Sequence, residues 1–362
     1  MMHRSRFVLP ALAAALLLAA GARAADSALD SLKQESPELK SAGALAMGPA
    51  GILFVGDPQA AAVFAIDTGD RTPATSTDRP KVEGLDEKIA SLLGIEAKQL
   101  LIKSLAVNPL SGNTYLAVAR GRGPDAKPVL VRVARDGKLS ELNLKGAKYA
   151  MAKLPNPVEG RQRQMAITCL AYVKGRVFVA GLSNEDFSSN LRAIPFPFSE
   201  VNGGAGVEIY HGSHGRFETK SPVRTFTTYD INGETNLLAA YTCTPLVKIP
   251  VSQLKPGGKV KGTTVAELGN HNVPLDMIVY KKDGKDYILM ANNSRGVMKI
   301  QTEGIDKAEA ITKRIADKAG LKYETITGLK GVEHLDRFGA DHALVLLKTG
   351  GGSYTLDTIA LP

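Results

Sequence analysis

Residues 275–293 have the sequence LDMIVYKKDGKDYILMANN, two apolar runs separated by a turn at Asp283-Gly284. Apolar runs on either side of an Asp-Gly pair predict two antiparallel strands joined by a tight hairpin. The pattern recurs at spacings of 49 to 65 residues, with further copies that start at Leu45, Leu105, Leu170, Phe226 and Leu335. A repeat of short strands with this period is typical of a β-propeller, in which each repeat forms one blade. The repeats therefore predict an all-β, six-bladed β-propeller, with seven blades as the alternative.

The turns indicate how the strands of each blade connect. Residues that tolerate a positive φ separate the two runs of a repeat, as in Lys174-Gly175 and Asn232-Gly233. We assign the two runs to the second and third strands of a four-stranded blade. The outermost strands are then expected at residues 62–67, 129–134, 191–195, 246–250 and 296–300, and the innermost strands at residues 101–103, 207–211, 264–268 and 323–327.

Two stretches depart from the strand pattern. Residues 85–99 carry apolar side chains at helical spacing, and residues 307–319 carry two isoleucines four positions apart before a glycine. Both patterns predict short helices inserted into the propeller. The propeller should occupy residues 44–362 as a single domain, preceded by a lead-in segment at residues 25–43.

Residues 1–24 form a candidate export signal. Arg4 and Arg6 precede an apolar run that ends in Ala-Arg-Ala at residues 22–24, which is typical of a signal-peptide cleavage site. The run is short for a membrane anchor and contains a proline. We therefore expect a periplasmic or secreted protein, released by cleavage near Ala24. We also expect a monomer without a membrane span.

Composition argues against several classes of function. The formal net charge is +9 and falls to +6 without the leader, because the leader carries three arginines and no acidic residue. The remaining positive charges are scattered and form no basic stripe interleaved with aromatic residues, so we expect no nucleic-acid partner. The chain has no tryptophan. This argues against sugar-binding propellers, and against propellers in which tryptophan docks pyrroloquinoline quinone.

Polar side chains gather in the loops that should open on one face of the propeller. We take this face as the binding site, because loops on a rigid scaffold commonly carry function. The candidate ligand-binding residues are Asp57, Asn184, His271, Asn272, Asn292, Asn293, Arg295, Glu333 and His334. The alternative is turn chemistry, since Asn and Gly tolerate a left-handed backbone. No nucleophile elbow, phosphate-binding loop or zinc-protease motif is present, so no catalytic residue is assigned.

Histidines and cysteines offer further candidates. His211 and His214, in the sequence HGSHG, have the spacing of metal ligands, but we interpret them as solvated side chains in a glycine-rich loop and predict no metal site. Cys169 and Cys243 are candidates for a disulfide, as expected of two cysteines in an exported chain. Two buried thiols are the alternative, and a soft metal site formed with His271 is a third interpretation.

The runs LAMGPAGILFVGD and DMIVYKKDGKDYILMANNSRGVMKI make the chain resemble secreted bacterial β-propellers of the NHL and YVTN type. This resemblance is architectural and implies the propeller fold. Because the polar rim carries no recognisable catalytic set, we expect a scaffold that binds a protein or a small ligand through one polar face, and we predict no cofactor. The chain is also similar in outline to gluconolactonase-like propellers, which hold a divalent cation in the channel through Glu, Asn and Asp. That resemblance implies a metal-dependent hydrolase or lactonase in which Glu333, Asn272 and Asp57 would bind the cation. The sequences around these three residues differ from that family's pattern.

Overall fold

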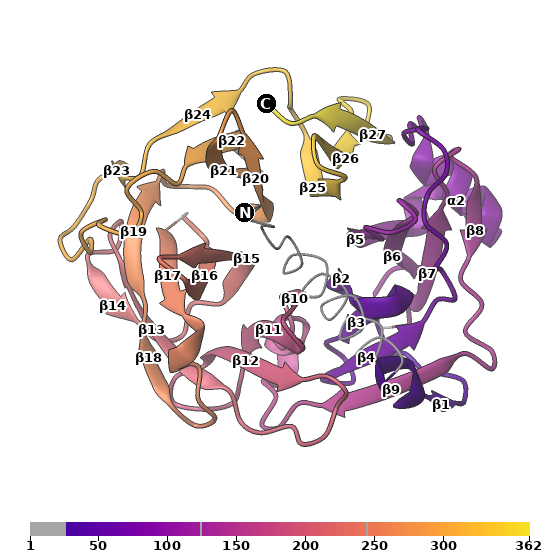
Figure 1. Ribbon diagram of the computed structural model, residues 1–362, viewed down its shortest axis with the longest axis horizontal. Coiled ribbons are helices and arrows are strands. Elements are labelled where there is room, and N and C mark those ends of the chain that lie inside the picture. The colour runs from indigo at the N-terminus through magenta and orange to yellow at the C-terminus, as the bar shows by residue number, and fades with distance from the viewer. Residues whose placement is uncertain (1–26, 124, 244) are drawn as a thin grey trace, which may run out of the picture.

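The computed structural model of the protein describes residues 27–123, 125–243 and 245–362. These residues form six sheets arranged radially around an axis, which confirms the six-bladed propeller (Figure 1). The export signal predicted at residues 1–24 lies outside the described residues. Within them, no helix has the length and apolar character needed to cross a membrane.

The first two blades contain the nine strands from β1 to β9. The first blade consists of β2 (Leu45–Met47), β3 (Ile52–Asp57) and β4 (Ala62–Asp67), with β9 (Lys148–Lys153) and β1 (Lys33–Gln34) on its outer side. The second blade consists of β5 (Leu100–Val107), β6 (Thr114–Arg120), β7 (Lys127–Val133) and β8 (Leu139–Glu141).

The third and fourth blades follow, each with an additional short strand. The third consists of β10 (Cys169–Val173), β11 (Arg176–Leu182), β12 (Ser189–Pro195), β13 (Ala205–His211) and β14 (Arg216–Glu218), with β18 (Lys259–Lys261) parallel to β13. The fourth consists of β15 (Val223–Ile231), β16 (Glu234–Tyr241), β17 (Pro245–Pro250), β19 (Thr263–Leu268) and β23 (Lys318–Gly320).

The last two blades complete the ring. The fifth consists of β20 (Pro274–Lys282), β21 (Lys285–Asn292), β22 (Gly296–Gln301) and β24 (Tyr323–Ile326), and the sixth of β25 (Val332–Phe338), β26 (His342–Lys348) and β27 (Tyr354–Ala360). Short helical segments connect some of the strands: α2 (Leu85–Leu93) and the 3₁₀ segments η1 (Pro49–Gly51), η2 (Ala97–Gln99), η3 (Gly160–Met165) and η4 (Val251–Gln253).

The hairpin turns are those predicted, but the strands they join lie one position closer to the axis. Lys174-Gly175 and Asn232-Gly233 have positive φ at both residues, and these turns connect the first strand of the blade to the second. The strands predicted as innermost at residues 207–211, 264–268 and 323–327 are outer strands instead. The second and third strands of a blade are both strongly apolar, as in β3 and β4, so the repeat shows where strands are and not which one faces the axis.

The blades do not follow one another around the ring in chain order. The innermost strands contact their neighbours in the order β5, β2, β10, β15, β20, β25 and back to β5 (Figure 1). The second blade therefore lies between the first and the sixth. The chain then crosses back, and β9 pairs with β4 to complete the first blade before the third blade begins.

The helix predicted at residues 85–99 is present as α2 followed by η2, and it seals the junction between the second and sixth blades. Leu85, Ile89 and Leu93 of α2 are buried in a core cluster shared by these two blades. Burying a side chain of this size stabilises the fold by about 1.5–3 kcal/mol. The Asp86 carboxylate accepts hydrogen bonds from Ser353 and Tyr354, and Val82 forms a two-way backbone bridge to β27. This segment partly replaces the missing outer strand of the sixth blade.

The second predicted helix is wrong. Residues 307–317 are irregular, and β23 begins at Lys318. The Ile311 N–H donates to the Thr264 carbonyl and the Ile315 N–H donates to the Gly212 carbonyl, over 2.9 Å in each case. Because these amides bond to other blades, they are not available for a helical ladder. The segment instead covers the outer edge of the third and fourth blades.

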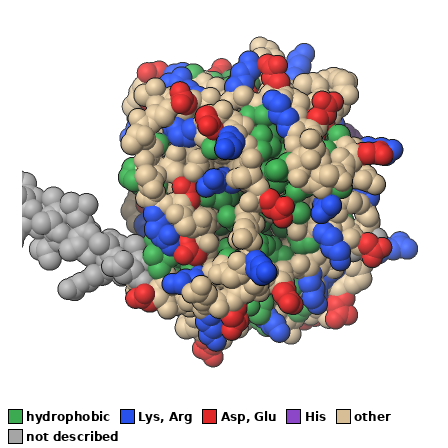
Figure 2. All heavy atoms as spheres, turned by 90° about the vertical axis from the view of Figure 1, so that its right-hand side faces the viewer, with side chains coloured by type: hydrophobic (Ala, Val, Ile, Leu, Met, Phe, Trp, Pro, Cys, Tyr) green, Lys and Arg blue, Asp and Glu red, His purple; other side chains and the backbone are tan. Residues whose placement is uncertain are grey.

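The scattered distribution of charge is visible on the surface. Figure 2 shows the side of the ring that carries the second blade, where lysine and arginine side chains are interspersed with aspartate and glutamate. This face shows no continuous basic stripe, as expected from the sequence.

Candidate functional site

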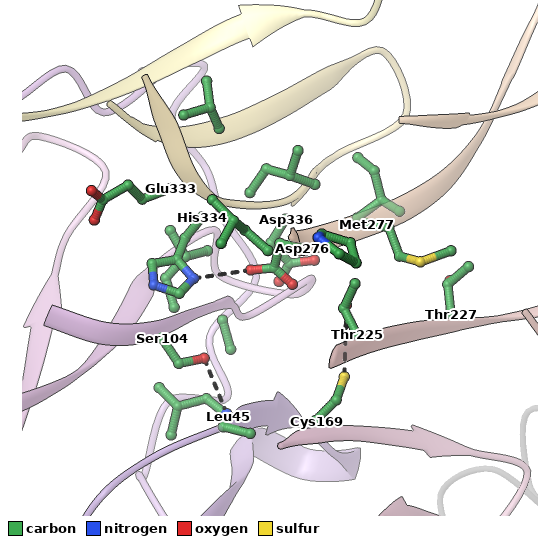
Figure 3. A pocket seen from close by; sticks show the side chains of 18 of the residues that line it. Leu45, Ser104, Cys169, Thr225, Thr227, Asp276, Met277, Glu333, His334 and Asp336 are labelled. Atoms are coloured by element: carbon green, nitrogen blue, oxygen red, sulfur yellow. Dashed lines mark hydrogen bonds and ion pairs between the residues drawn. The ribbon is translucent and has the colours of Figure 1, made fainter. Parts of the chain in front are cut away.

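A channel with a volume of about 1390 Å³ runs along the axis. Its wall is made by the innermost strands of all six blades, β2, β5, β10, β15, β20 and β25. Segments far apart in sequence therefore meet at one place, as the close view in Figure 3 shows. The channel is the main candidate for a binding site.

Four of the six innermost strands carry an irregularity near their first residues. The register shifts by one residue in β5, β15, β20 and β25, which leaves Lys103, Arg224, Leu275 and Glu333 without a partner on the neighbouring strand. A β-bulge of this kind redirects side chains, and bulges are common beside functional sites. In all four strands the bulged residue and the one after it are among the residues that line the cavity.

Side chains that follow the bulges link neighbouring blades around the channel. The Leu45 N–H donates to Ser104 Oγ over 3.2 Å, and Cys169 Sγ lies 3.9 Å from Thr225 Oγ1. His334 Nδ1 lies 3.2 Å from Asp276 Oδ2. Each contact joins a different pair of adjacent blades, so these three contacts link the innermost strands of the ring in pairs (Figure 3).

A second carboxylate, Asp336, lies two residues further along β25. One of its oxygens accepts a hydrogen bond from the Val107 N–H over 2.8 Å, and the other accepts one from the Arg337 N–H. Burial raises the pKa of Asp336 to about 6, against the opposing effect of these two hydrogen bonds, and the Asp276 charge raises it further. The channel thus holds an acid that titrates well above the usual range of an aspartate.

Three cationic side chains that line the channel have no acceptor among the described residues: Lys103, Arg224 and Lys330. The Lys103 ammonium makes no hydrogen bond or ion pair with any of them, and the Arg224 Nε is buried without a partner there. Burial lowers the pKa of both Lys103 and Arg224, and the positive charge of Arg122 adds to the effect at Lys103. β5 and β15 are three positions apart in a ring of six, so Lys103 and Arg224 lie on opposite walls.

Glu333 is the bulged residue of β25, and two side chains of the same blade contact its carboxylate. Its carboxylate accepts a hydrogen bond from the Tyr354 hydroxyl over 2.8 Å and lies 3.8 Å from the Lys348 ammonium. Burial, together with this carboxylate, raises the pKa of Tyr354. The tyrosine therefore remains a hydrogen-bond donor that orients Glu333 at the channel wall.

Only part of the predicted site lines this channel. Glu333, His334, Asn292 and Asn293 do. Asp57 does not: it is fully buried and accepts hydrogen bonds from the Lys40 N–H, Ser41 Oγ and the Ala60 N–H, so it pins the lead-in segment to the first blade.

Three other predicted residues form turns around the start of β20. Asn272 Nδ2 donates to Asn292 Oδ1 over 2.8 Å, and Asn272 Oδ1 accepts from the backbone of Ser294 and Arg295. The Arg295 guanidinium donates to the Asn270 carbonyl and pairs with Asp317. His271 is exposed, with φ of 55°. The turn interpretation therefore describes this network better than ligand binding does.

Asn184 occupies a turn between β11 and β12. Its side chain is exposed, and its backbone N–H donates to the Asn156 carbonyl over 2.8 Å. It is not among the residues that line the channel.

The two cysteines are unbonded thiols, so the predicted disulfide is not formed. Cys169 faces the channel beside Thr225, whereas Cys243 lies beside His211 and His214 on the outer part of the ring. Burial raises the pKa of Cys169 to about 12, and the charge of Asp276 raises it further, in spite of weak hydrogen bonds to its sulfur. This thiol is therefore protonated at neutral pH.

Lys103, Arg224 and Asp336 were missed as site residues, and Asp276 was not selected. A signal was present: Lys103 interrupts the apolar run LLIKSLAV, and Arg224 follows a buried valine. Charged side chains are rarely buried in an apolar core, so a charged residue inside an apolar strand indicates that this part of the strand faces solvent or a polar cavity. The bulges that direct these residues cannot be read from the repeat itself.

The fold and the site together define a six-bladed β-propeller with a polar central channel. No family model and no curated protein matches the chain. Among solved structures, it is similar to the PQQ-bound aldose sugar dehydrogenase from Streptomyces coelicolor, with 14% identity, a TM-score of 0.38, and coverage of 90% of this chain and 95% of that one. It is also similar to a putative oxidoreductase (glucose dehydrogenase) from Thermus thermophilus, with 14% identity, a TM-score of 0.31, and coverage of 91% and 99%.

Proposed function

We propose that the protein binds a small anionic ligand in its central channel, between Lys103 and Arg224. The observation that carries this proposal is the presence of two cations on opposite walls, neither with an acceptor among the described residues. The Lys103 side chain is exposed, and Arg224 is half-buried with its Nε unpartnered there, so an anion between them would gain charge-assisted hydrogen bonds from both.

The groups around the two cations suit a ligand that also carries hydroxyls. Glu333 and Asp276 can accept hydrogen bonds from hydroxyl groups, and His334 can donate or accept at the ring nitrogen that does not bind Asp276. We therefore favour a small hydroxylated carboxylate or phosphate monoester. The carboxylates would disfavour a ligand of high negative charge, because they share the channel with the cations.

Calorimetric titration with a panel of small carboxylates and phosphate monoesters tests the proposal. A charge-assisted hydrogen bond contributes about 1.5–3 kcal/mol, so Lys103→Ala or Arg224→Ala should weaken binding by about 10- to 100-fold. Lys138→Ala removes an exposed lysine of the second blade outside the channel and is the matched control. Equal affinity in all three variants would refute a site between the two cations.

The hydrolase alternative receives less support from the geometry. It needs Glu333, Asn272 and Asp57 to direct their oxygens at one cation. The oxygens of Asp57 and Asn272 already accept hydrogen bonds from backbone N–H groups of Lys40, Ala60 and Ser294. We retain the proposal that the protein is exported and monomeric. Cell fractionation and size-exclusion chromatography test these two points.

A further inference from the structure

A second cluster of chemically reactive side chains lies outside the channel. A ring nitrogen of His211, a ring nitrogen of His214 and the Cys243 sulfur lie within 4.8 Å of one another. His211 ends β13 and His214 lies in the turn between β13 and β14 of the third blade, and the cysteine belongs to the turn between β16 and β17 of the fourth. Figure 1 shows β13 and β14 beside β19 and β23, at the outer edge of these two blades.

One carboxylate orients both imidazoles. Glu218 Oε2 lies 3.0 Å from His211 Nδ1, and Glu218 Oε1 lies 2.7 Å from His214 Nδ1. The two rings are close, with centroids 3.8 Å apart. A carboxylate bonded to Nδ1 fixes the tautomer that leaves Nε2 free, which is the usual arrangement of a metal-binding histidine. Arg216 and Ser221 also bond to Glu218 and hold it in place.

The free nitrogen of His211 has no hydrogen-bond partner within the described part of the chain. His211 is 2% exposed, and its Nε2 is buried without a donor or acceptor there. A buried polar atom normally finds a partner, and one that does not calls for an explanation. The expectation that HGSHG is a solvated loop was therefore wrong for His211, although His214 remains partly exposed.

A second buried atom also calls for an explanation. Glu267 on β19 accepts a hydrogen bond from the Gly212 N–H over 2.6 Å, at the turn between the two histidines. Its other oxygen, Oε2, is buried and has no partner among the described residues. Glu267 also lies opposite Pro245 on β17, two residues from Cys243. Glu267 therefore contacts the backbone between the two histidines without being part of the three-ligand cluster itself.

We propose that His211, His214 and Cys243 form a binding site for a zinc or copper ion, with Glu218 as the carboxylate that positions both imidazoles. Two imidazoles and a thiolate are ligands that zinc and copper prefer over magnesium or calcium. The site is independent of the channel and of the ligand proposed for it. It would join the third and fourth blades through their outer turns.

The surroundings allow a metal to enter while holding the ligands rigidly. The Cys243 N–H donates to the Asn272 carbonyl over 2.7 Å, which fixes the cysteine turn against the fifth blade. The Ile315 N–H bonds to the Gly212 carbonyl, so the segment before β23 covers the histidine turn. The side chain of His214 is 45% exposed and provides the route from solvent.

Titration of the reduced, metal-free protein with Co²⁺ tests the proposal. We expect one equivalent to bind, with the visible bands of tetrahedral cobalt and a thiolate-to-cobalt charge-transfer band. Zn²⁺ or Cu⁺ should displace the cobalt, and Mg²⁺ or Ca²⁺ should not. Glu218→Gln should weaken binding by about 10- to 100-fold, because it removes the carboxylate behind both ligands.

Matched variants locate the site. Cys243→Ser should abolish the charge-transfer band, and Cys169→Ser, which changes the other thiol, should leave it intact. His214→Ala is a partly exposed substitution that should weaken cobalt binding without unfolding the protein, whereas His342→Ala should have no effect. The proposal is overturned if wild-type protein binds no cobalt, or if the spectrum survives in Cys243→Ser or is lost in Cys169→Ser.

Discussion

Replacing Asp336 by asparagine should change how stability depends on pH. In the folded protein the pKa of Asp336 rises from its usual value of 3.8 to about 6, because the carboxyl is buried near Asp276. A rise of this size corresponds to about 3 kcal/mol of differential stability. Asparagine has the same shape and carries no charge at any pH, so it removes this contribution. It can still accept one of the two backbone hydrogen bonds that the carboxylate accepts.

The sign follows from where the proton is held. Between about pH 4 and pH 6 the folded wild-type protein keeps a proton that the unfolded chain releases, so its free energy of unfolding falls as pH rises through this window. Once the pH is well above the folded-state pKa, the loss is complete. The free energy of unfolding of Asp336→Asn, minus that of wild type, should therefore increase by about 2–3 kcal/mol from pH 4 to pH 7. A lost hydrogen bond would shift the whole curve by about 1 kcal/mol without changing its shape.

Urea unfolding of both proteins at intervals between about pH 3.5 and pH 7.5 measures this difference. Asp341→Asn removes one carboxylate from the exposed turn after β25 and serves as the comparison for a simple change in net charge. A difference curve for Asp336→Asn that is flat, or that falls as pH rises, would show that the buried acid does not titrate as described.

Three further outcomes are expected. Asp57→Ala should lower the free energy of unfolding by about 3 kcal/mol, because it leaves buried donors without an acceptor, yet calorimetry should show unchanged binding in the channel. Asp70→Ala should lower the free energy of unfolding in urea by at least as much, because four side chains, including Asn108, donate hydrogen bonds to that buried carboxylate. A decrease in the free energy of unfolding of less than about 1 kcal/mol would contradict this expectation. Timed alkylation followed by mass spectrometry should label Cys243 well before Cys169, whose pKa burial raises to about 12, and equal rates would count against the buried thiol.

The sequence predicted the blades because each repeat carries its own local information. Hairpins at Lys174-Gly175 and Asp283-Gly284 depend on residues that accept positive φ, and these occur where the repeat places them. The helix at residues 85–99 was also predictable, since its buried face repeats at helical spacing. The helix expected at residues 307–319 failed because long-range hydrogen bonds from Ile311 and Ile315 outweigh local helix propensity.

The sites were harder to predict because they depend on which blades are neighbours. Glu333 and His334 were selected as polar residues of a loop that should open on the binding face, whereas Lys103 and Arg224 lie at bulges that the repeat does not reveal. His211 and Cys243 belong to different blades, and nothing in the chain between them indicates that their turns meet. Polar residues that form turns, such as Asn272, have the same composition as ligand residues and can be separated from them only by their hydrogen bonds.

The displaced position of the second blade has a consequence for biosynthesis. A nascent chain that has just left the ribosome with β2, β3 and β4 cannot cap that sheet, because its next strand, β9, is translated only after the whole of the second blade. The open edge of β4 must wait for roughly eighty further residues, about 4–16 s at ordinary elongation rates. Unlike a simple tandem array, this ring cannot mature one unit at a time from its amino end.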